Sequence, residues 1–407
     1  MTVVNKYADL LKTRGVARII SAQLTARLPS GMLSLAYLLH IEAIFDSYGL
    51  AGLVLAATSL GQALAGPLTS RWMGYWAMRP VIILTIAVSI LSMAGIAFAS
   101  LPIGGYIIVG FIGGLATPPI QPAVRTIYPT MVNSKQLTPL FSLDASAQEI
   151  IWIAGPVVTT FVATQISTVW AILVAAVFLI GGGVWFLSCR ELGTVTIPPS
   201  RSKLGVVLKK PAVLLATVVG FLLIGSAAAV EVAVVSVFGE KGAQAGLVLA
   251  IWAFGSIIGG LGLGGLAIGP WALATRMAVV FIGISLAGFI LDFWWISFAL
   301  LIAGAGIAPA LAVMFAIVSS SVKFSETAEA YGWMGSGQLV GAALGSAIAG
   351  FAIDGFGSPG GFAAAAAFAL VGVLVATIFK KAHPDLRGKD PSPIPDTEPV
   401  RTITEQP

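Results

Sequence analysis

Three ionisable side chains stand inside long apolar stretches of the sequence: Arg27, Glu149 and Glu231. An ionisable residue inside a membrane-spanning helix costs about 2.5–3.5 kcal/mol on insertion scales, so each is a candidate for function. Arg27 and Glu149 are expected at comparable depth, where an ion pair would neutralise both charges. That pair has two interpretations: a structural link between two helices, or a pair that responds to protons or substrate. Glu231 is a candidate for proton coupling.

Arg125 lies at the end of one apolar stretch, and Asp144 lies at the start of the next, which also holds Glu149. We favour a salt bridge between them at the edge of a gate over a ligand-binding pair. Other side chains within the apolar stretches could either line an amphipathic pocket or pack helices together. They are Gln62, Gln148, Trp152, Trp252, Phe254 and Gln338.

The composition indicates which elements must position these residues. The chain has 407 residues, of which 57% are hydrophobic and 10% charged, and its mean hydropathy is +0.97. A soluble protein carries roughly 25% charged residues, so a cytosolic enzyme and a nucleic-acid-binding protein are excluded. A disordered chain is excluded because disorder requires low hydrophobicity. A single cysteine, Cys189, and two histidines leave little for a metal site, and we expect neither a metal nor a cofactor.

Twelve stretches are apolar over the roughly 20 residues that a helix needs to cross a bilayer. They are 17–44, 48–70, 80–100, 104–127, 143–165, 168–188, 212–237, 245–268, 272–291, 294–318, 328–352 and 360–380. Buried helices of a large soluble protein would need amphipathic helices to cover them, and the sequence offers none. The predicted fold class is therefore an all-α integral membrane protein with twelve transmembrane helices.

The positions of Lys and Arg orient these spans. With the N-terminus in the cytoplasm, 20 of the 22 basic residues fall in cytoplasmic segments, Arg27 lies inside a span, and Lys241 lies in an outer loop. We therefore expect a multi-pass protein of the plasma membrane with both termini cytoplasmic. The net charge of +5 is a topology signal and does not indicate a nucleic acid or another acidic partner.

An internal repeat divides the spans into two sets. The hexapeptide AGLVLA occurs at 51–56 and again at 245–250, in the second and eighth spans. Such repeats place a substrate site at the midplane between two bundles that rock against each other. The predicted organisation is a cytoplasmic N-terminus (1–15), a six-helix bundle (16–189), a cytoplasmic central loop (190–211), a second six-helix bundle (212–381) and a disordered cytoplasmic tail (382–407).

Twelve spans in a six-plus-six repeat, with a basic central loop, resemble the major facilitator superfamily over about residues 15–381. The segment from Gly66 to Gly74, GPLTSRWMG, is similar to the family's loop signature, Gly-x-x-x-Asp-Arg-x-Gly. Arg71 matches its arginine, Ser70 stands in the place of its Asp, and the last glycine is displaced by one. Gly155-Pro156 resembles the core of the family's antiporter signature.

The Arg27-Leu-Pro element, together with Asp144 and Glu149 in the fifth span, is similar to actinobacterial family members described as efflux permeases. The resemblance implies a secondary active transporter, a twelve-span drug:proton antiporter that exports a small amphipathic compound or metabolite by alternating access. A proton-coupled uptake symporter for a small metabolite is the alternative, and only the partial antiporter signature favours export. The expected partners are a small-molecule substrate, protons and the lipid bilayer, with the chain acting as a monomer.

An enzyme or an ATP-driven pump is not expected. The sequence contains no GxxxxGK[ST] phosphate-binding loop, no GxSxG nucleophile elbow and no HExxH zinc motif. A receptor would need a soluble signalling domain, and the polar tail after the last span offers none.

Overall fold

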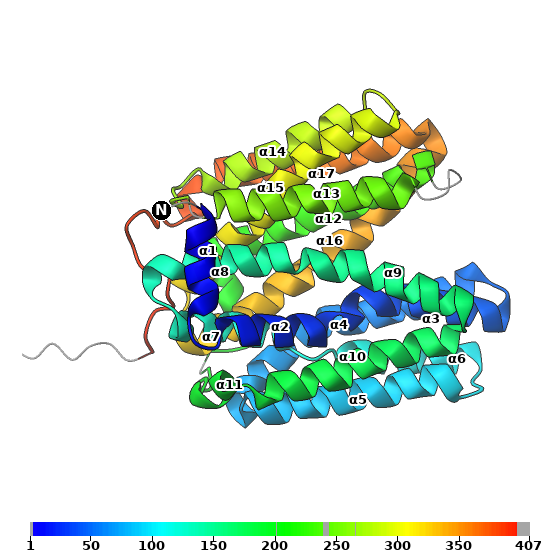
Figure 1. The fold of residues 1–407 in the computed structure, drawn as a ribbon, viewed down its shortest axis with the longest axis horizontal. Coiled ribbons are helices and arrows are strands. Elements are labelled where there is room, and N and C mark those ends of the chain that lie inside the picture. Colours follow the sequence, from blue (N-terminus) through cyan, green and yellow to red (C-terminus); the bar gives the residue numbers. More distant parts are fainter. Residues whose placement is uncertain (1–2, 201, 239–243, 265, 397–407) are drawn as a thin grey trace, which may run out of the picture.

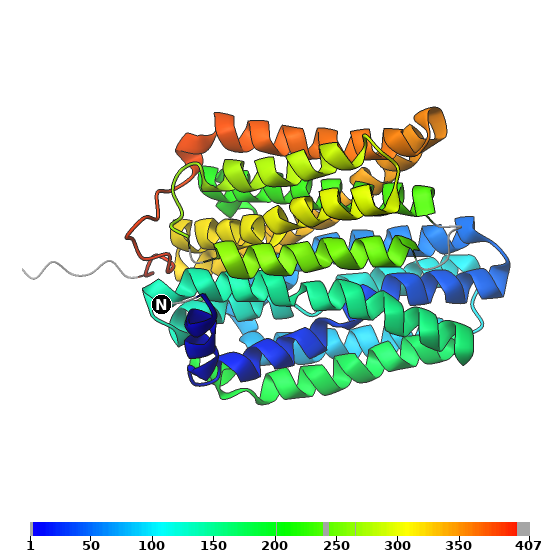
Figure 2. The ribbon, with the colours of Figure 1, turned by 45° about the horizontal axis from the view of Figure 1, so that its top comes forward.

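The computed structural model describes residues 3–200, 202–238, 244–264 and 266–396. Long helices run roughly along one common axis, and no strand occurs in the described ranges (Figures 1 and 2). This is the arrangement that a bilayer demands, because a helix pairs its backbone N–H and C=O groups internally where no water is present. The chain is a multi-pass membrane protein.

The N-terminal half begins with a short helix, and three of its six spans are interrupted. Its helices are α1 (Val3–Lys12), α2 (Val16–Arg27), α3 (Pro29–Phe45), α4 (Tyr48–Trp76), α5 (Met78–Phe98), α6 (Ile103–Leu115), α7 (Ile120–Met131), α8 (Ser134–Ala147), α9 (Glu149–Gln165), α10 (Thr168–Ser188) and α11 (Arg190–Thr194). Proline accounts for two interruptions, because it lacks a backbone N–H: Pro29 begins α3, and Pro118 and Pro119 separate α6 from α7. The third interruption lies at Gln148, between α8 and α9.

The spans of the C-terminal half are continuous helices. They are α12 (Pro211–Phe238), α13 (Gln244–Leu263), α14 (Ala272–Ala287), α15 (Phe293–Ser321), α16 (Phe324–Phe356) and α17 (Ser358–Ile378), with the short 3₁₀ helices η1 (Val206–Lys209) and η2 (Lys380–Ala382) at their ends. Helix α15 is the most enclosed of them and contributes buried residues along its whole length.

The predicted spans agree with the observed helices apart from their ends. Eleven segments of the described chain are long and apolar enough to cross a membrane, and the ninth predicted span corresponds to the shorter α14, with 16 residues. The fifth span begins at Ser134 rather than at 143, because the Asn133 side chain accepts a hydrogen bond from the Gln136 backbone and caps α8 there. Pro139 lies inside this helix and does not end it.

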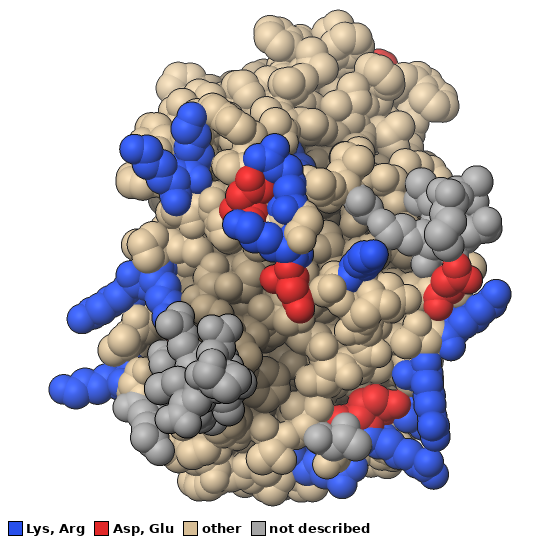
Figure 3. Space-filling model, turned by 90° about the vertical axis from the view of Figure 1, so that its left-hand side faces the viewer, with Lys and Arg blue, Asp and Glu red and all other residues tan. Residues whose placement is uncertain are grey.

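One end of the bundle carries α1, α11 and the C-terminal segment, on the left in Figure 1. Lys and Arg side chains gather around it in Figure 3, and we call it the basic end. The two halves touch near this end. A Cβ atom on Gly66 of α4 would lie 2.7 Å from the Gly332 carbonyl oxygen of α16, and the Ser142 hydroxyl of α8 donates to the Gly260 carbonyl of α13 at 2.5 Å. The halves are therefore closed together at the basic end.

The expectation of a disordered tail is wrong for residues 382–396. Ile394 pairs with the α15–α16 turn, accepting from the Phe324 backbone N–H at 3.0 Å and donating to the Val322 carbonyl at 2.9 Å. Asp396 accepts from the Ser325 hydroxyl at 2.5 Å and from its backbone N–H. The tail is ordered by hydrogen bonds to the α15–α16 turn, and its polar composition alone gives no sign of these partners. Residues 397–407 lie outside the described ranges.

Candidate functional site

A buried ion pair lies in the N-terminal half. The Arg125 Nε of α7 lies 3.0 Å from the Asp144 Oδ2 of α8, and the two side chains are 1% and 0% exposed. The other carboxylate oxygen, Oδ1, accepts hydrogen bonds from the Tyr128 hydroxyl and the Gln23 amide, each at 3.0 Å. The ion pair expected from the sequence is thus present, but it is fully enclosed and does not lie at a solvent-facing edge.

Arg27, the last residue of α2, joins this pair through two glutamines. Its guanidinium donates to the Gln23 Oε1 at 2.8 Å and to the Gln148 Oε1 at 3.2 Å. Arg125 donates to the same Gln148 oxygen at 3.4 Å. We call these six residues, Gln23, Arg27, Arg125, Tyr128, Asp144 and Gln148, the polar cluster. It holds two cations and one carboxylate, so it carries an excess positive charge.

The expected Arg27–Glu149 ion pair is wrong. Gln148, the neighbour of Glu149, is the residue that reaches Arg27. Consecutive residues of a helix point about 100° apart, so Glu149 faces away from Arg27. Glu149 instead accepts a hydrogen bond from the Ser256 hydroxyl of α13, at 2.9 Å, and this bond crosses from one half of the protein to the other. The charge of Glu231 on α12 also acts on Glu149.

Neither of these glutamates has a cationic partner in the part of the chain that the structure describes. The ion pairs found there involve other carboxylates, those of Glu191, Glu329, Asp144, Glu326 and Asp385. The Ser256 hydroxyl that bonds Glu149 also accepts the Ala308 backbone N–H at 3.2 Å, which fixes its position within the C-terminal half. Glu149 therefore lies at the contact of the halves without a compensating charge, whereas the side chain of Glu231 is exposed on α12.

A small cavity adjoins Arg27 within the N-terminal half. Its volume is about 60 Å³, which is room for a few water molecules. Polar groups from four spans line it, including Ser30, Gln62, Ser89 and Thr117. Gln62, a pocket candidate from the sequence, thus lies beside Arg27. A larger cavity lies elsewhere, at the basic end of the C-terminal half, and is remote from this cluster.

The other pocket candidates do not meet in one place. Trp252 is buried in α13, and Gln338 packs against Gly220 within the C-terminal half. Trp152 of α9 and Phe254 of α13 are 55% and 57% exposed. Of the six pocket candidates, Gln62 lines the cavity beside Arg27 and Gln148 belongs to the polar cluster, whereas a pocket shared by all six stays a prediction.

The segment resembling the loop signature lies where the halves meet. Arg71 of α4 forms an ion pair with Glu329 of α16 at 3.0 Å and also donates to the Ser202 carbonyl of the central loop. Ser70 is buried, and its hydroxyl finds no partner among the described residues. Gly74 packs near Pro198, where a Cβ atom would lie 3.2 Å from the proline carbonyl oxygen.

Gly155, which precedes Pro156 in α9, lets two helices approach closely. A Cβ atom on Gly155 would lie 2.6 Å from the Gly31 carbonyl carbon of α3. A side chain cannot be accommodated at that distance, so the glycine is required for the packing of these spans.

Four site residues escaped the sequence analysis: Gln23, Tyr128, Ser256 and Phe315. Gln23 lies four positions before Arg27, and Tyr128 three after Arg125, which are spacings that place side chains on one helix face. That periodicity could have found them. Phe315 comes from the other half, and its ring centre lies 3.4 Å from the Arg125 guanidinium. No local signal predicts a contact of that kind.

Comparison with known proteins decides the family. The model of the Major Facilitator Superfamily matches residues 19–322 and 271–404, which together cover most of the chain. The chain belongs to the major facilitator superfamily. No curated protein matches it.

Solved structures share the fold of this superfamily member. A bacterial homologue of the iron transporter ferroportin, in an outward-facing state, is 12% identical with a TM-score of 0.73, over 90% of this chain and 100% of that one. The human organic anion transporter MFSD10 (TETRAN) is 17% identical with a TM-score of 0.67, over 89% and 99%. The proton:xylose symporter XylE is 12% identical with a TM-score of 0.69, over 92% and 97%. The protein is therefore a transporter of the secondary type and not an enzyme.

Proposed function

We propose that this protein is a proton-coupled secondary transporter that exports a small amphipathic compound or metabolite by alternating access. The observation that carries the proposal is the Ser256–Glu149 hydrogen bond of 2.9 Å, which links the halves at a carboxylate without a cationic partner. Glu149 forms no ion pair among the described residues, so its carboxylate can hold a proton at the contact of the halves. Binding and release of a proton at this carboxylate would change the contact between the halves, and transport would then depend on the proton gradient.

In this proposal a polar group of the substrate binds beside Arg27, in a cavity of about 60 Å³ that has room for such a group alone. The polar cluster has one more cation than carboxylate, and the Arg27 side chain borders a cavity with hydroxyl and amide groups. An electron-rich oxygen or a carboxylate on a mostly apolar molecule suits such a site. The human organic anion transporter among the structural neighbours carries a compatible substrate class in its name.

Orientation and location belong to the same proposal. The basic end is taken to face the cytoplasm of a cell whose plasma membrane holds the protein as a monomer, in line with the positive-inside rule (Figure 3). The N-terminal bundle of residues 16–189, the central loop 190–211 and the C-terminal bundle 212–381 are then the units that move. The gap between Ser256 and Glu149 would change in each cycle.

The experiment uses purified protein in liposomes with a pH-sensitive dye in the lumen. A panel of small organic acids and neutral amphipathic compounds is added under pH gradients of each sign. Export by antiport predicts that substrate and protons move in opposite directions, whereas an uptake symporter moves them together. Transport without any movement of protons would refute the coupling. The control for Glu149→Gln is Glu42→Gln, the same chemical change near the C-terminal end of α3.

A further inference from the structure

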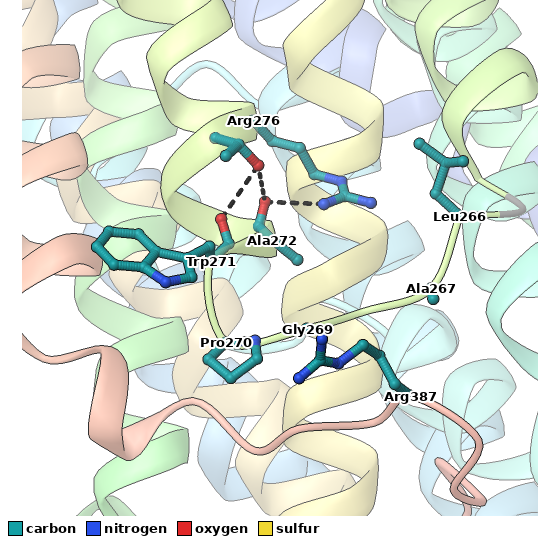
Figure 4. A pocket seen from close by; sticks show the side chains of 9 residues that line it. Leu266, Ala267, Gly269, Pro270, Trp271, Ala272, Arg276 and Arg387 are labelled. Carbon is teal, nitrogen blue, oxygen red and sulfur yellow. Dashed lines mark hydrogen bonds between the residues drawn. The ribbon is translucent and has the colours of Figure 1, made fainter.

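A second site lies at the basic end of the C-terminal half. Figure 4 shows a pocket bounded by the loop before α14, the first turns of that helix and Arg387 of the C-terminal segment. Its volume is about 630 Å³. None of the polar cluster residues reaches it, so the transport site does not account for its features.

The first of these features is a buried guanidinium group. Arg276 of α14 is 8% exposed, yet its Nε finds no partner among the described residues. Its Nη1 donates to the Ala272 carbonyl at 2.8 Å, and no described carboxylate forms an ion pair with it. A buried charged donor without an acceptor is costly, which points to a ligand that supplies oxygen atoms.

The second feature is the start of α14 itself. The helix begins at Ala272 and runs for 16 residues, its N-cap residue Trp271 makes no side-chain capping bond, and its first turn contains no acidic residue. The free backbone N–H groups of a helix start carry a partial positive charge that favours anions.

Arg387 supplies a second guanidinium from the chain segment that crosses the pocket. Figure 4 shows it reaching toward Gly269 in the loop before α14. Asp385 holds it through bonds of 2.9 and 2.6 Å, and these bonds lower the pKa of Asp385 to about 2. Arg387 keeps further N–H donors for a ligand, because a guanidinium group has five.

We propose that this pocket binds the phosphate group of an anionic phospholipid. A phosphate oxygen would accept from the Arg276 Nε and from Arg387, next to the start of α14. The surroundings favour a lipid over a free anion. Trp271 and Leu266 are 50% and 54% exposed at the pocket, and the Lys380 ammonium lies 4.2 Å from the Trp271 ring centre. Such aromatic and basic side chains are typical of the membrane interface, where a headgroup and its acyl chains could both find contacts.

The test measures lipid binding to the purified full-length protein by native mass spectrometry. Phosphatidylglycerol and phosphatidylcholine are the lipid probes, and inorganic phosphate is the third. We expect phosphatidylglycerol to bind at least about tenfold more tightly than phosphatidylcholine. Arg276→Gln and Arg387→Gln should each weaken it about tenfold, as the loss of a charge-assisted hydrogen bond predicts. Asp385→Asn should tighten it, since Arg387 is then released.

Arg79→Gln is the matched control, because Arg79 is an exposed arginine at the start of α5 in the other half. It removes the same charge and should leave binding unchanged. Equal weakening by this control would reveal a general charge effect and overturn the site. Displacement of the lipid by millimolar inorganic phosphate would overturn the lipid assignment. Arg387 is a surface residue, so its variant remains informative even where Arg276→Gln fails to fold.

Discussion

Replacing Asp144 by asparagine tests whether the polar cluster holds the N-terminal half together. The carboxylate accepts three hydrogen bonds of 3.0 Å, from Arg125, Tyr128 and Gln23, and it is the carboxylate that balances two arginines. Removing one partner of a buried ion pair costs about 3–5 kcal/mol, because the other charge stays behind without compensation. The Phe315 ring lies over the Arg125 guanidinium with or without the carboxylate, so this cation–π contact does not offset the loss. We therefore expect a destabilisation of about 3–5 kcal/mol.

The assay is thermal unfolding of the purified protein together with its abundance in membranes. The Arg125→Met, Asp144→Asn double variant should regain more than half of the loss, because neither charge then stays unpaired. Asp354→Asn, at an exposed position of α16, is the control and should change stability by less than about 0.5 kcal/mol. Wild-type stability of the Asp144→Asn protein would refute the reasoning, and so would a double variant as unstable as the two single changes combined.

Three further predictions concern the contacts between helices. Glu149→Gln should leave stability nearly unchanged, since the amide oxygen still accepts from Ser256, but transport should lose its dependence on the pH gradient; a retained dependence would exclude Glu149 as the coupling group. Arg71→Gln should raise amide hydrogen exchange over residues 324–336 about tenfold, because the bond to Glu329 closes the halves at the basic end, and unchanged exchange would show that this bond contributes little. Gly155→Ala should destabilise by about 1–3 kcal/mol through overpacking against α3, whereas Gly181→Ala, which has open space around it, should be neutral, and equal effects of the two would contradict the packing argument.

The helices could be predicted because the signal for each is local. Hydropathy over about 20 residues identifies a span without any knowledge of its neighbours, and the observed helices follow the predicted ones closely. The Arg125–Asp144 pair could also be predicted, since consecutive spans in one half bring their facing ends together.

The error at Arg27 shows where sequence reasoning ends. The direction of a side chain around its helix depends on the register, and one residue turns it by about 100°. The interruption at Gln148 shifts that register within the fifth span. A neutral glutamine therefore faces Arg27, while the charged Glu149 faces the other half. The contacts of Phe315 and of the C-terminal segment likewise join parts of the chain that are far apart in sequence.

The two halves share a sequence repeat but differ in what their spans do. Each interruption lies beside the polar cluster or its cavity: Leu28 follows Arg27, Gln148 belongs to the cluster, and Thr117 lines the cavity. The corresponding spans of the C-terminal half are unbroken, and that half reaches the site through Ser256 and Phe315. Where a spanning helix is interrupted, backbone N–H and C=O groups become available to a ligand near the middle of the bilayer. Discontinuous helices of this kind form the substrate sites of many transporters. We therefore propose that substrate recognition originates in the N-terminal half and that the C-terminal half moves against it as a continuous block.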